Sequence, residues 1–253
     1  MPHLAWFAGL DAAHVALLLA ASFAGSLMTA SLGVGGGAFL LGIMAGLVPP
    51  LALIPVHGLV QMGSNAGRAW MTRRHASTRV VGLFTLGGLI AAPATVLLLG
   101  RLSPHWIPLF VGFFILALTW LPLPHFAQRT GPLWLIVGGL VTTLITVLAG
   151  ATGPLVSAWL GRDQGDRWHY TANFSSCMTL QHALKLIAFA LAGFAFLPWL
   201  PLLALMIGCG YLGTLTGLKL LGRLRDVHFK PLFRIVMTLL ALRVIWVWSG
   251  IHL

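Results

Sequence analysis

The chain has 253 residues, of which 58% are hydrophobic and only 8% are charged, and its mean hydropathy is +0.95. A water-soluble domain of ordinary composition cannot bury that much apolar surface, so lipid must cover most of the chain. The formal net charge of +11 could suggest a nucleic-acid partner, but Lys and Arg are split among short loops and helix interiors. Composition therefore predicts an integral membrane protein that does not bind nucleic acid.

Apolar stretches near the ~20 residues that span a bilayer recur along the chain and predict an all-α fold with about eight transmembrane helices. No Lys or Arg precedes the first stretch, so we expect it to be a retained helix rather than a cleaved signal peptide. We place the helices at 12–30, 51–71, 80–99, 105–121, 132–150, 169–192, 200–220 and 230–249.

Two shorter apolar pieces, 38–47 and 154–160, follow the first and fifth helices, and neither can span a bilayer alone. Each comes after a flexible break, 33–37 (GVGGG) in one case and 150–154 (GATGP) in the other. Such breaks expose N–H groups at a helix start, where the positive end of the dipole favours an anion. In the second break Thr152 or Gly153 can cap the helix. We therefore predict two half-helix N-termini that frame one anion, with close glycine-mediated packing of helices as the alternative.

The chain is predicted to be an internal duplication. An offset of 116 positions brings the two breaks to within one residue of each other and superposes the half-helices and the helices that follow. That offset sets His57 against Asn173, Gln61 against Cys177, Asn65 against Gln181 and Ala69 against Lys185. We predict one membrane domain of two four-helix repeats, 1–125 and 126–253, each with a broken half-helix, while chance similarity between two hydrophobic halves is the alternative.

Two helices carry a polar stripe at membrane depth. In the second helix the stripe follows helical spacing, with His57, Gln61, Asn65 and Arg68 on one face. In the sixth helix Asn173, Cys177, Gln181 and Lys185 repeat every four residues, with His182 beside them. Two such faces could line one cavity, although polar side chains can also bond neighbouring helices and Arg68 could snorkel to the headgroups.

The sign of the buried charge favours an anion. All four acidic residues, Asp11, Asp163, Asp166 and Asp226, lie in predicted helix ends or loops. The basic residues Arg68, Lys185, Arg234 and Arg243 therefore have no evident buried acidic partner. Burial of an unpaired cation in a low dielectric costs free energy unless water solvates the cation or an anion pairs with it. His57 and His182 could accept a coupling proton, or they could be hydrogen-bonded core residues.

An intramembrane enzyme would need a nucleophile, a base or a set of metal ligands on facing helices, and the sequence shows no such arrangement. The two cysteines, Cys177 and Cys209, lie in apolar segments and fit neither a disulfide framework nor a zinc site. We predict no enzyme activity, cofactor or metal.

Orientation stays open at this stage. Arg73, Arg74 and Arg79 indicate one cytoplasmic loop, and Lys219, Arg223, Arg225 and Lys230 indicate another. Both loops cannot be cytoplasmic if every helix crosses the membrane once, so either a broken segment is re-entrant or one loop is an exception to the rule.

The glycine break resembles the sulfite exporter TauE/SafE family, whose repeats carry a Gly-x-Gly-Gly-Gly-like segment after their first helix. Residues 33–37 match that segment closely, 57–68 looks like the second helix in one branch of the family, and 182–185 looks like its partner. The resemblance spans nearly the whole chain and implies a multi-pass permease of the bacterial inner membrane for sulfite, sulfonates or other small anions. The second break departs from the pattern because it lacks consecutive glycines.

We expect alternating access at a midplane site between the repeats. A coupling proton or ion and a homo-oligomer are left open, and a passive anion channel or a non-transporting structural subunit of a membrane complex is the alternative. The predicted substrate-binding residues are Gly35, Gly36, Gly37, His57, Gln61, Asn65, Arg68, Thr152, Gly153, Asn173, Cys177, Gln181, His182 and Lys185.

Overall fold

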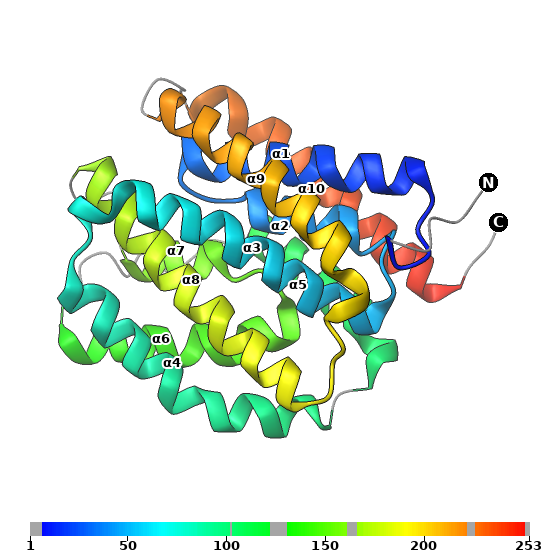
Figure 1. Ribbon diagram of the computed structural model, residues 1–253, viewed down its shortest axis with the longest axis horizontal. Coiled ribbons are helices and arrows are strands. Elements are labelled where there is room, and N and C mark those ends of the chain that lie inside the picture. The colour runs from blue at the N-terminus through cyan, green and yellow to red at the C-terminus, as the bar shows by residue number, and fades with distance from the viewer. Residues whose placement is uncertain (1–6, 102, 122–130, 161–165, 222–225, 251–253) are drawn as a thin grey trace.

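A computed structural model describes residues 7–101, 103–121, 131–160, 166–221 and 226–250, with 226–230 described by their backbone alone. All regular secondary structure in these ranges is helical (Figure 1). The α-helices are α1 (Ala12–Leu32), α2 (Gly36–Met44), α3 (Pro50–Thr72), α4 (Thr78–Leu99), α5 (Ile107–Trp120), α6 (Pro132–Ala149), α7 (Gly153–Leu160), α8 (Arg167–Leu191), α9 (Leu200–Leu220) and α10 (Asp226–Ser249). The eight long helices and two half-helices predicted from the sequence are confirmed as helices, with ends shifted by a few residues.

Local chemistry sets several helix ends. Asp11 caps α1 by accepting from the His14 N–H, and Asp166 caps α8 by accepting from the Trp168 N–H. The bond from Trp168 holds the pKa of the exposed Asp166 carboxyl below its ordinary value. At the other end of α1, Gly33 adopts a φ of 90°, which favours glycine and stops the helix.

The central feature of the fold is the antiparallel pair α3 and α8 (Figure 1). Gly58 near the start of α3 faces Lys185 near the end of α8, and Arg68 near the end of α3 lies close enough to Tyr170 near the start of α8 to interact electrostatically. The pair α1 and α9 packs along one flank of this centre, and α4 and α6 along the other. α5 and α10 pack against each other, also antiparallel, since the Trp120 indole donates to Thr238.

The bundle has two ends, which we name the arginine side and the pocket side. The arginine side holds the end of α3 with Arg73 and Arg74, and the start of α8. The pocket side holds an apolar pocket of about 490 Å³. That pocket is lined from the start of α3, the ends of α4, α6 and α8, and the starts of α5 and α9. The start of α1 and the end of α10 also lie toward the pocket side, at the right of Figure 1.

Both half-helices turn back toward the side from which the chain came. α6 runs from the arginine side into the bundle, and α7 returns, because Ser157 in α7 accepts from Tyr170 at the arginine end of α8. α1 runs from the pocket side, and α2 returns to it before α3 begins. The chain from Arg79 to Lys219 therefore begins and ends on the arginine side. The two basic loops could not lie on one side if every helix crossed once, and the return of the half-helices removes this conflict. Arg223 and Arg225 lie outside the described residues, as does the side chain of Lys230.

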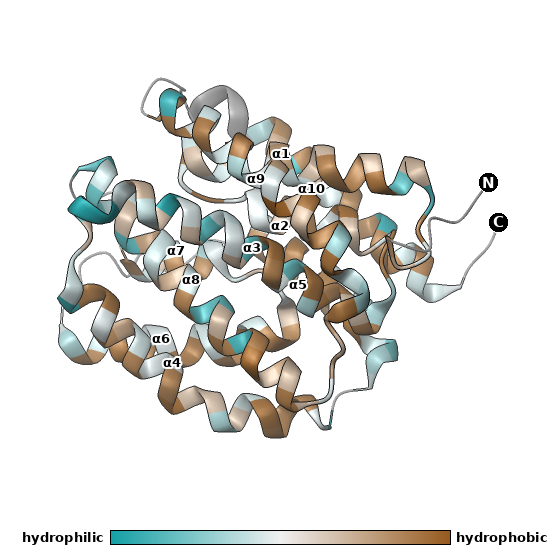
Figure 2. Cartoon of the chain, viewed as in Figure 1, coloured by the Kyte–Doolittle hydropathy of each residue, from teal (hydrophilic) through white to brown (hydrophobic). Residues whose placement is uncertain are grey.

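Six helical segments within the described ranges are long and apolar enough to cross a membrane: Ala12–Leu32, Thr78–Leu99, Pro132–Ala149, Arg167–Leu191, Leu197–Leu220 and Pro231–Ser249. α3 is long enough but carries the polar stripe, and the apolar helix around α5, Pro104–Trp120, is short. Surrounding helices bury the polar stripe of α3, so this helix does not need an apolar surface. The count of eight spans stays a prediction. Figure 2 shows hydrophobic residues along most of the helices, with hydrophilic residues mainly at helix ends and on the central pair.

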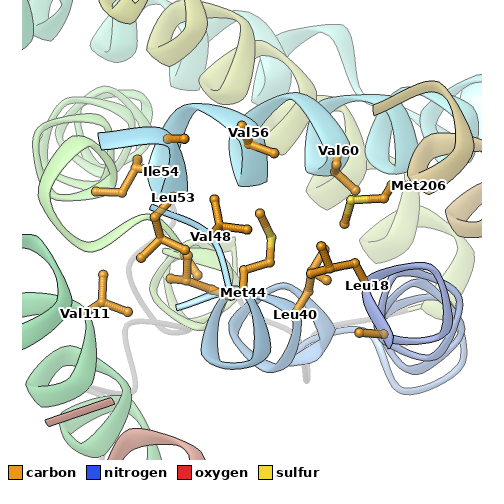
Figure 3. Packing of buried hydrophobic residues seen from close by; sticks show 14 of the residues in the cluster. Leu18, Leu40, Met44, Val48, Leu53, Ile54, Val56, Val60, Val111 and Met206 are labelled. Carbon is orange, nitrogen blue, oxygen red and sulfur yellow. The ribbon is translucent and has the colours of Figure 1, made fainter. Parts of the chain in front are cut away.

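The larger hydrophobic cluster forms around α2 (Figure 3). Leu40 and Met44 of α2 pack among Leu18 of α1, Val60 of α3 and Met206 of α9, and all five are essentially unexposed. This packing surrounds α2 with side chains of three other helices. The start of α2 is thereby held at a fixed depth inside the bundle.

Candidate functional site

A small cavity lies where the starts of α2 and α7 meet the central pair α3 and α8. Its volume is about 20 Å³, more than the roughly 10–15 Å³ that a single buried water needs. Both predicted breaks contribute to its wall, and so do both polar stripes. The lining residues are Thr29, Gly35, Gly37, Ala38, His57, Gln61, Asn65, Ala151, Gly153, Pro154, Phe174, Met178 and His182.

The starts of α2 and α7 both line this cavity. α2 begins at Gly36, and its first intrahelical bond runs from Phe39 N to Gly35 O, so the earlier N–H groups have no partner within the helix. α7 begins at Gly153, and its first such bond runs from Val156 N to Thr152 O. Gly35 has a φ of 106°, a conformation that a residue with a side chain rarely adopts. The partial positive charge of both starts therefore converges on one buried space.

Two histidines of the central pair face each other across the site. The rings of His57 and His182 are 6.3 Å apart between centroids and nearly perpendicular. His57 bonds through Nε2 to the Gly37 carbonyl at 2.8 Å. His182 is 1% exposed, and neither of its ring nitrogens has a hydrogen-bond partner in the described part of the chain. A buried imidazole without partners is costly, so the site has spare capacity for a polar ligand.

Asn65 adds a second free polar atom. Its Nδ2 donates to the Gln61 carbonyl at 2.8 Å, while its buried Oδ1 has no hydrogen-bond partner among the residues described. Among the described lining residues none is acidic. The wall thus offers imidazole and backbone N–H groups without a carboxylate, which suits an anion better than a cation, whereas Asn65 Oδ1 can only accept a hydrogen bond.

Gly36 has the role in close helix packing that was the alternative to anion binding for the glycine breaks. A Cβ added there would lie 1.7 Å from the Gly25 carbonyl oxygen of α1, so only glycine allows this approach of α1 and α2. Gly37 differs, because its added Cβ would meet the flexible end of Gln61 at 3.3 Å. At Gly36 the geometry therefore supports the packing alternative, whereas Gly35 and Gly37 line the cavity.

The second predicted stripe is divided among several environments. Gln181 accepts from the Thr152 hydroxyl at 2.8 Å and donates to Thr142 at 2.7 Å, so these three residues fix the break before α7. Asn173 accepts from the Ser77 N–H at 2.7 Å. None of these side chains lines the cavity. Their geometry is that of structural contacts, and a direct binding role for Thr152, Gln181 and Asn173 stays a prediction.

Cys177 lies in a second hydrophobic cluster with Phe84, Val156, Phe174 and Met178, where it is fully buried and outside the cavity wall. It therefore serves as an apolar packing residue rather than a polar member of the stripe.

Two buried cations flank the cavity on opposite sides. Lys185 is 1% exposed, and its Nζ donates to the Gly150 carbonyl at 2.9 Å, at the negative C-terminal end of α6. Arg68 is also 1% exposed, and its three guanidinium nitrogens have no hydrogen-bond partner among the described residues. Gly58, which contacts Lys185, precedes Arg68 by ten residues on α3, or roughly 15 Å along the helix.

The other two basic residues considered from the sequence are not buried. Arg234 is exposed and lies 5.7 Å from the Trp120 ring, and Arg243 is exposed on the same helix, α10. Arg234 and Arg243 therefore do not contribute to the buried positive charge, which comes from Arg68 and Lys185. Both lie toward the outer surface, where headgroups or water can solvate them.

Comparison with known families identifies the family of the chain. The family model of the sulfite exporter TauE/SafE matches residues 17–244. The chain belongs to the sulfite exporter TauE/SafE family. TauE/SafE proteins are membrane transporters and not enzymes, so this multi-pass chain is a transporter of sulfur-containing anions by family. No curated protein and no solved structure shows significant similarity to the chain.

The structure also gives a different offset between the halves of this TauE/SafE chain. Gly33 and Gly150 end α1 and α6 with positive φ, Gly36 and Gly153 begin α2 and α7, and Pro50 and Arg167 begin α3 and α8, each 117 positions apart. An offset of 117 rather than 116 aligns Arg68 with Lys185. The offset of 116 missed this match because it is one residue shorter than the spacing between the two breaks and between the helix starts. The apolar wall of Phe174 and Met178 was missed because apolar residues are common throughout the chain.

Proposed function

We propose that this chain carries small sulfur-containing anions, such as sulfite or short sulfonates, across the bacterial inner membrane by alternating access at the central cavity. The observation that carries the proposal is the fully buried His182, which has no hydrogen-bond partner among the described residues, at a cavity between two helix starts whose described lining holds no carboxylate. A tetrahedral or pyramidal oxyanion could accept hydrogen bonds from the helix starts and from an imidazole N–H together.

The helix contacts support two repeats, 1–125 and 126–253. If α1–α5 correspond in order to α6–α10, then α1 corresponds to α6 and α4 corresponds to α9. The contact of α1 with α9 then corresponds to the contact of α6 with α4, and these are the two flanking pairs. The same correspondence maps α3 onto α8 and α5 onto α10, and both of these pairs are antiparallel. Corresponding helices that run in opposite directions are related by a two-fold axis perpendicular to the helices. This is the geometry of inverted repeats. Alternating access would follow from rocking of one repeat against the other.

Arg68 and Lys185 would then serve successive stages of transport. Each occupies the equivalent position in its repeat, and each lies beyond the cavity toward a different side. An anion that leaves the helix starts toward the arginine side would meet Arg68, and one that leaves toward the pocket side would meet Lys185. Each cation would lower the cost of a charge that is only partly hydrated during passage.

The distribution of surface cations supports an orientation. Arg73, Arg74, Arg79 and Arg167 flank helix ends on the arginine side, and Lys219 ends α9 there. By the positive-inside rule, the arginine side would face the cytoplasm. The apolar pocket would then open to the opposite face.

The test is transport of radiolabelled sulfite into proteoliposomes, measured against concentration. A carrier gives flux that saturates, is accelerated by unlabelled sulfite on the far side, and is lost in His182→Phe, whose ring fills a similar volume without donors. Linear flux without acceleration would indicate a channel. Absence of flux for sulfite, thiosulfate and sulfonates, with no stabilisation of the purified protein by any of them, would support the structural-subunit alternative.

A further inference from the structure

A group of metal-binding side chains lies on the arginine side, away from the cavity. The loop after α3 is fixed to the first turns of α8, because Ser77 N donates to Asn173 at 2.7 Å and the His75 ring stacks on Trp168 with centroids 5.9 Å apart. The same docking brings His75 to His169, with ring centroids 5.4 Å apart. His75 is thus positioned by a segment separate from the helix that carries His169.

The donor atoms already have nearly the spacing that a metal ion requires. Asp166 Oδ2 and His169 Nδ1 are 3.2 Å apart, and one donor atom of each of His75, Asp166 and His169 lies within 4.8 Å of the others. Two ligands that each lie about 2.0–2.1 Å from a tetrahedral ion are about 3.4 Å apart. Only the imidazole of His75 has to move closer. All three residues are exposed or half-buried, so rotamer changes can supply this movement.

Helix capping explains one part of this cluster but leaves the other part unexplained. Asp11 and His14 at the start of α1 repeat the arrangement of Asp166 and His169, with 3.1 Å between Asp11 Oδ2 and His14 Nδ1. Within the described chain no further His, Cys or acidic ligand joins Asp11 and His14 in a cluster of three. Capping therefore accounts for an Asp and His pair at a helix start, but it does not require His75.

We propose that His75, Asp166 and His169 bind a divalent transition-metal ion of borderline softness, such as Zn²⁺, Co²⁺ or Ni²⁺. Two imidazoles with one carboxylate suit these ions, whereas Mg²⁺ and Ca²⁺ prefer oxygen ligands throughout. Three protein ligands leave at least one position for water. The site is distinct from the cavity, since none of its three residues lines the cavity wall.

The position of the ion would let it restrain motion between the two halves of the chain. His75 lies between α3 and α4, whereas Asp166 and His169 begin α8, so a bound ion connects segments far apart in sequence. Metal binding does not depend on the proposed function, but its effect on transport does. A bound ion would oppose any rocking that separates the loop after α3 from the start of α8.

Binding can be tested on tag-free, full-length protein in detergent with Zn²⁺ and Co²⁺. We expect Zn²⁺ to raise Tm by roughly 5–10 °C at about 100 times Kd, and Co²⁺ to give visible absorption bands of a bound ion. His75→Phe keeps a ring to stack on Trp168, and Asp166→Asn keeps the helix cap, yet each removes a ligand. Both variants should keep the metal-free Tm and bind at least about tenfold more weakly. His14→Phe is the matched control and should respond like the unaltered protein.

Two results would overturn the site: no metal-dependent shift in the unaltered protein, or equal shifts and absorption in His75→Phe. In proteoliposomes we expect Zn²⁺ on the arginine side to slow sulfite flux in the unaltered protein and not in His75→Phe. Equal slowing in both would refute the restraint between the halves. Absence of all flux would count against the proposed function, while Tm and Co²⁺ absorption would still decide the metal site.

Discussion

Two adjacent glycines provide a sharp test of the site, because alanine should fail at each for a different reason. At Gly36 the added Cβ would lie 1.7 Å from the Gly25 carbonyl oxygen and 2.5 Å from the Thr29 hydroxyl oxygen. Since the obstacle includes backbone, α1 and α2 would have to separate by about 1.5 Å. We expect Gly36→Ala to cost about 3 kcal/mol or more, which lowers Tm by roughly 6–12 °C in a chain of this size.

At Gly37 the fold should tolerate alanine while the site does not. The added Cβ meets only Gln61 Oε1 at 3.3 Å, and alanine raises helix propensity by up to ~1 kcal/mol over glycine. We therefore expect Gly37→Ala to change stability by less than about 1 kcal/mol. The cavity is only about 20 Å³, however, so a methyl group on its wall competes directly with an anion. An overpacking cost of about 1–3 kcal/mol in the bound state weakens binding by roughly 5- to 150-fold.

The assay pairs thermal unfolding in detergent with sulfite flux in proteoliposomes for both variants. Gly36→Ala should unfold early, and Gly37→Ala should unfold normally but bind and carry sulfite poorly. Normal flux in a stable Gly37→Ala protein would show that the cavity is not the transport site. Normal stability in Gly36→Ala would show that α1 and α2 do not approach as closely as described.

Three further substitutions separate binding from structural roles. Lys185→Met should leave Tm within about 3 °C, because removal of a buried charge offsets the lost bond to Gly150, yet it should slow sulfite flux at least tenfold. An unchanged flux would remove Lys185 from the scheme. Arg68→Met removes a buried cation that has no hydrogen-bond partner among the described residues, so we expect an equal or higher Tm. Sulfite flux should be at least tenfold slower. A sharp fall in Tm would instead reveal a partner for Arg68. Asn173→Ala should cost about 1–3 kcal/mol by leaving the Ser77 N–H unpaired, measured as a lower Tm, while the Km for sulfite stays constant; a raised Km would restore Asn173 as a binding residue.

The helices were largely predictable because the signals for them are local. Apolar length placed α4 and α9 within two residues of their observed starts, and the two glycine breaks placed the half-helices. The direction of the half-helices was not predictable, since the turn after Gly33 or Gly150 depends on which neighbours receive α2 and α7. The bond from Tyr170 to Ser157, between different helices, shows the return of α7 directly.

The site was predictable in part for the same reason. Helical spacing correctly grouped His57, Gln61 and Asn65 on one lining face, because those positions belong to one rigid helix. Spacing alone could not distinguish Gln181 and Asn173 from lining residues, since their partners Thr142, Thr152 and Ser77 come from other helices. The packing role of Gly36 likewise depends on how closely α1 approaches α2, and no local sequence pattern predicts that distance.

Arg68 and Lys185 occupy matched positions but differ in chemistry, since a planar guanidinium can grip an oxyanion by two bonds and an ammonium acts as a point charge. This difference cannot set the direction of net flux, which the gradients alone determine. It can make the two half-cycles unequal in speed. A carrier of this design should therefore show different Km values when the same anion is offered from opposite faces of the membrane.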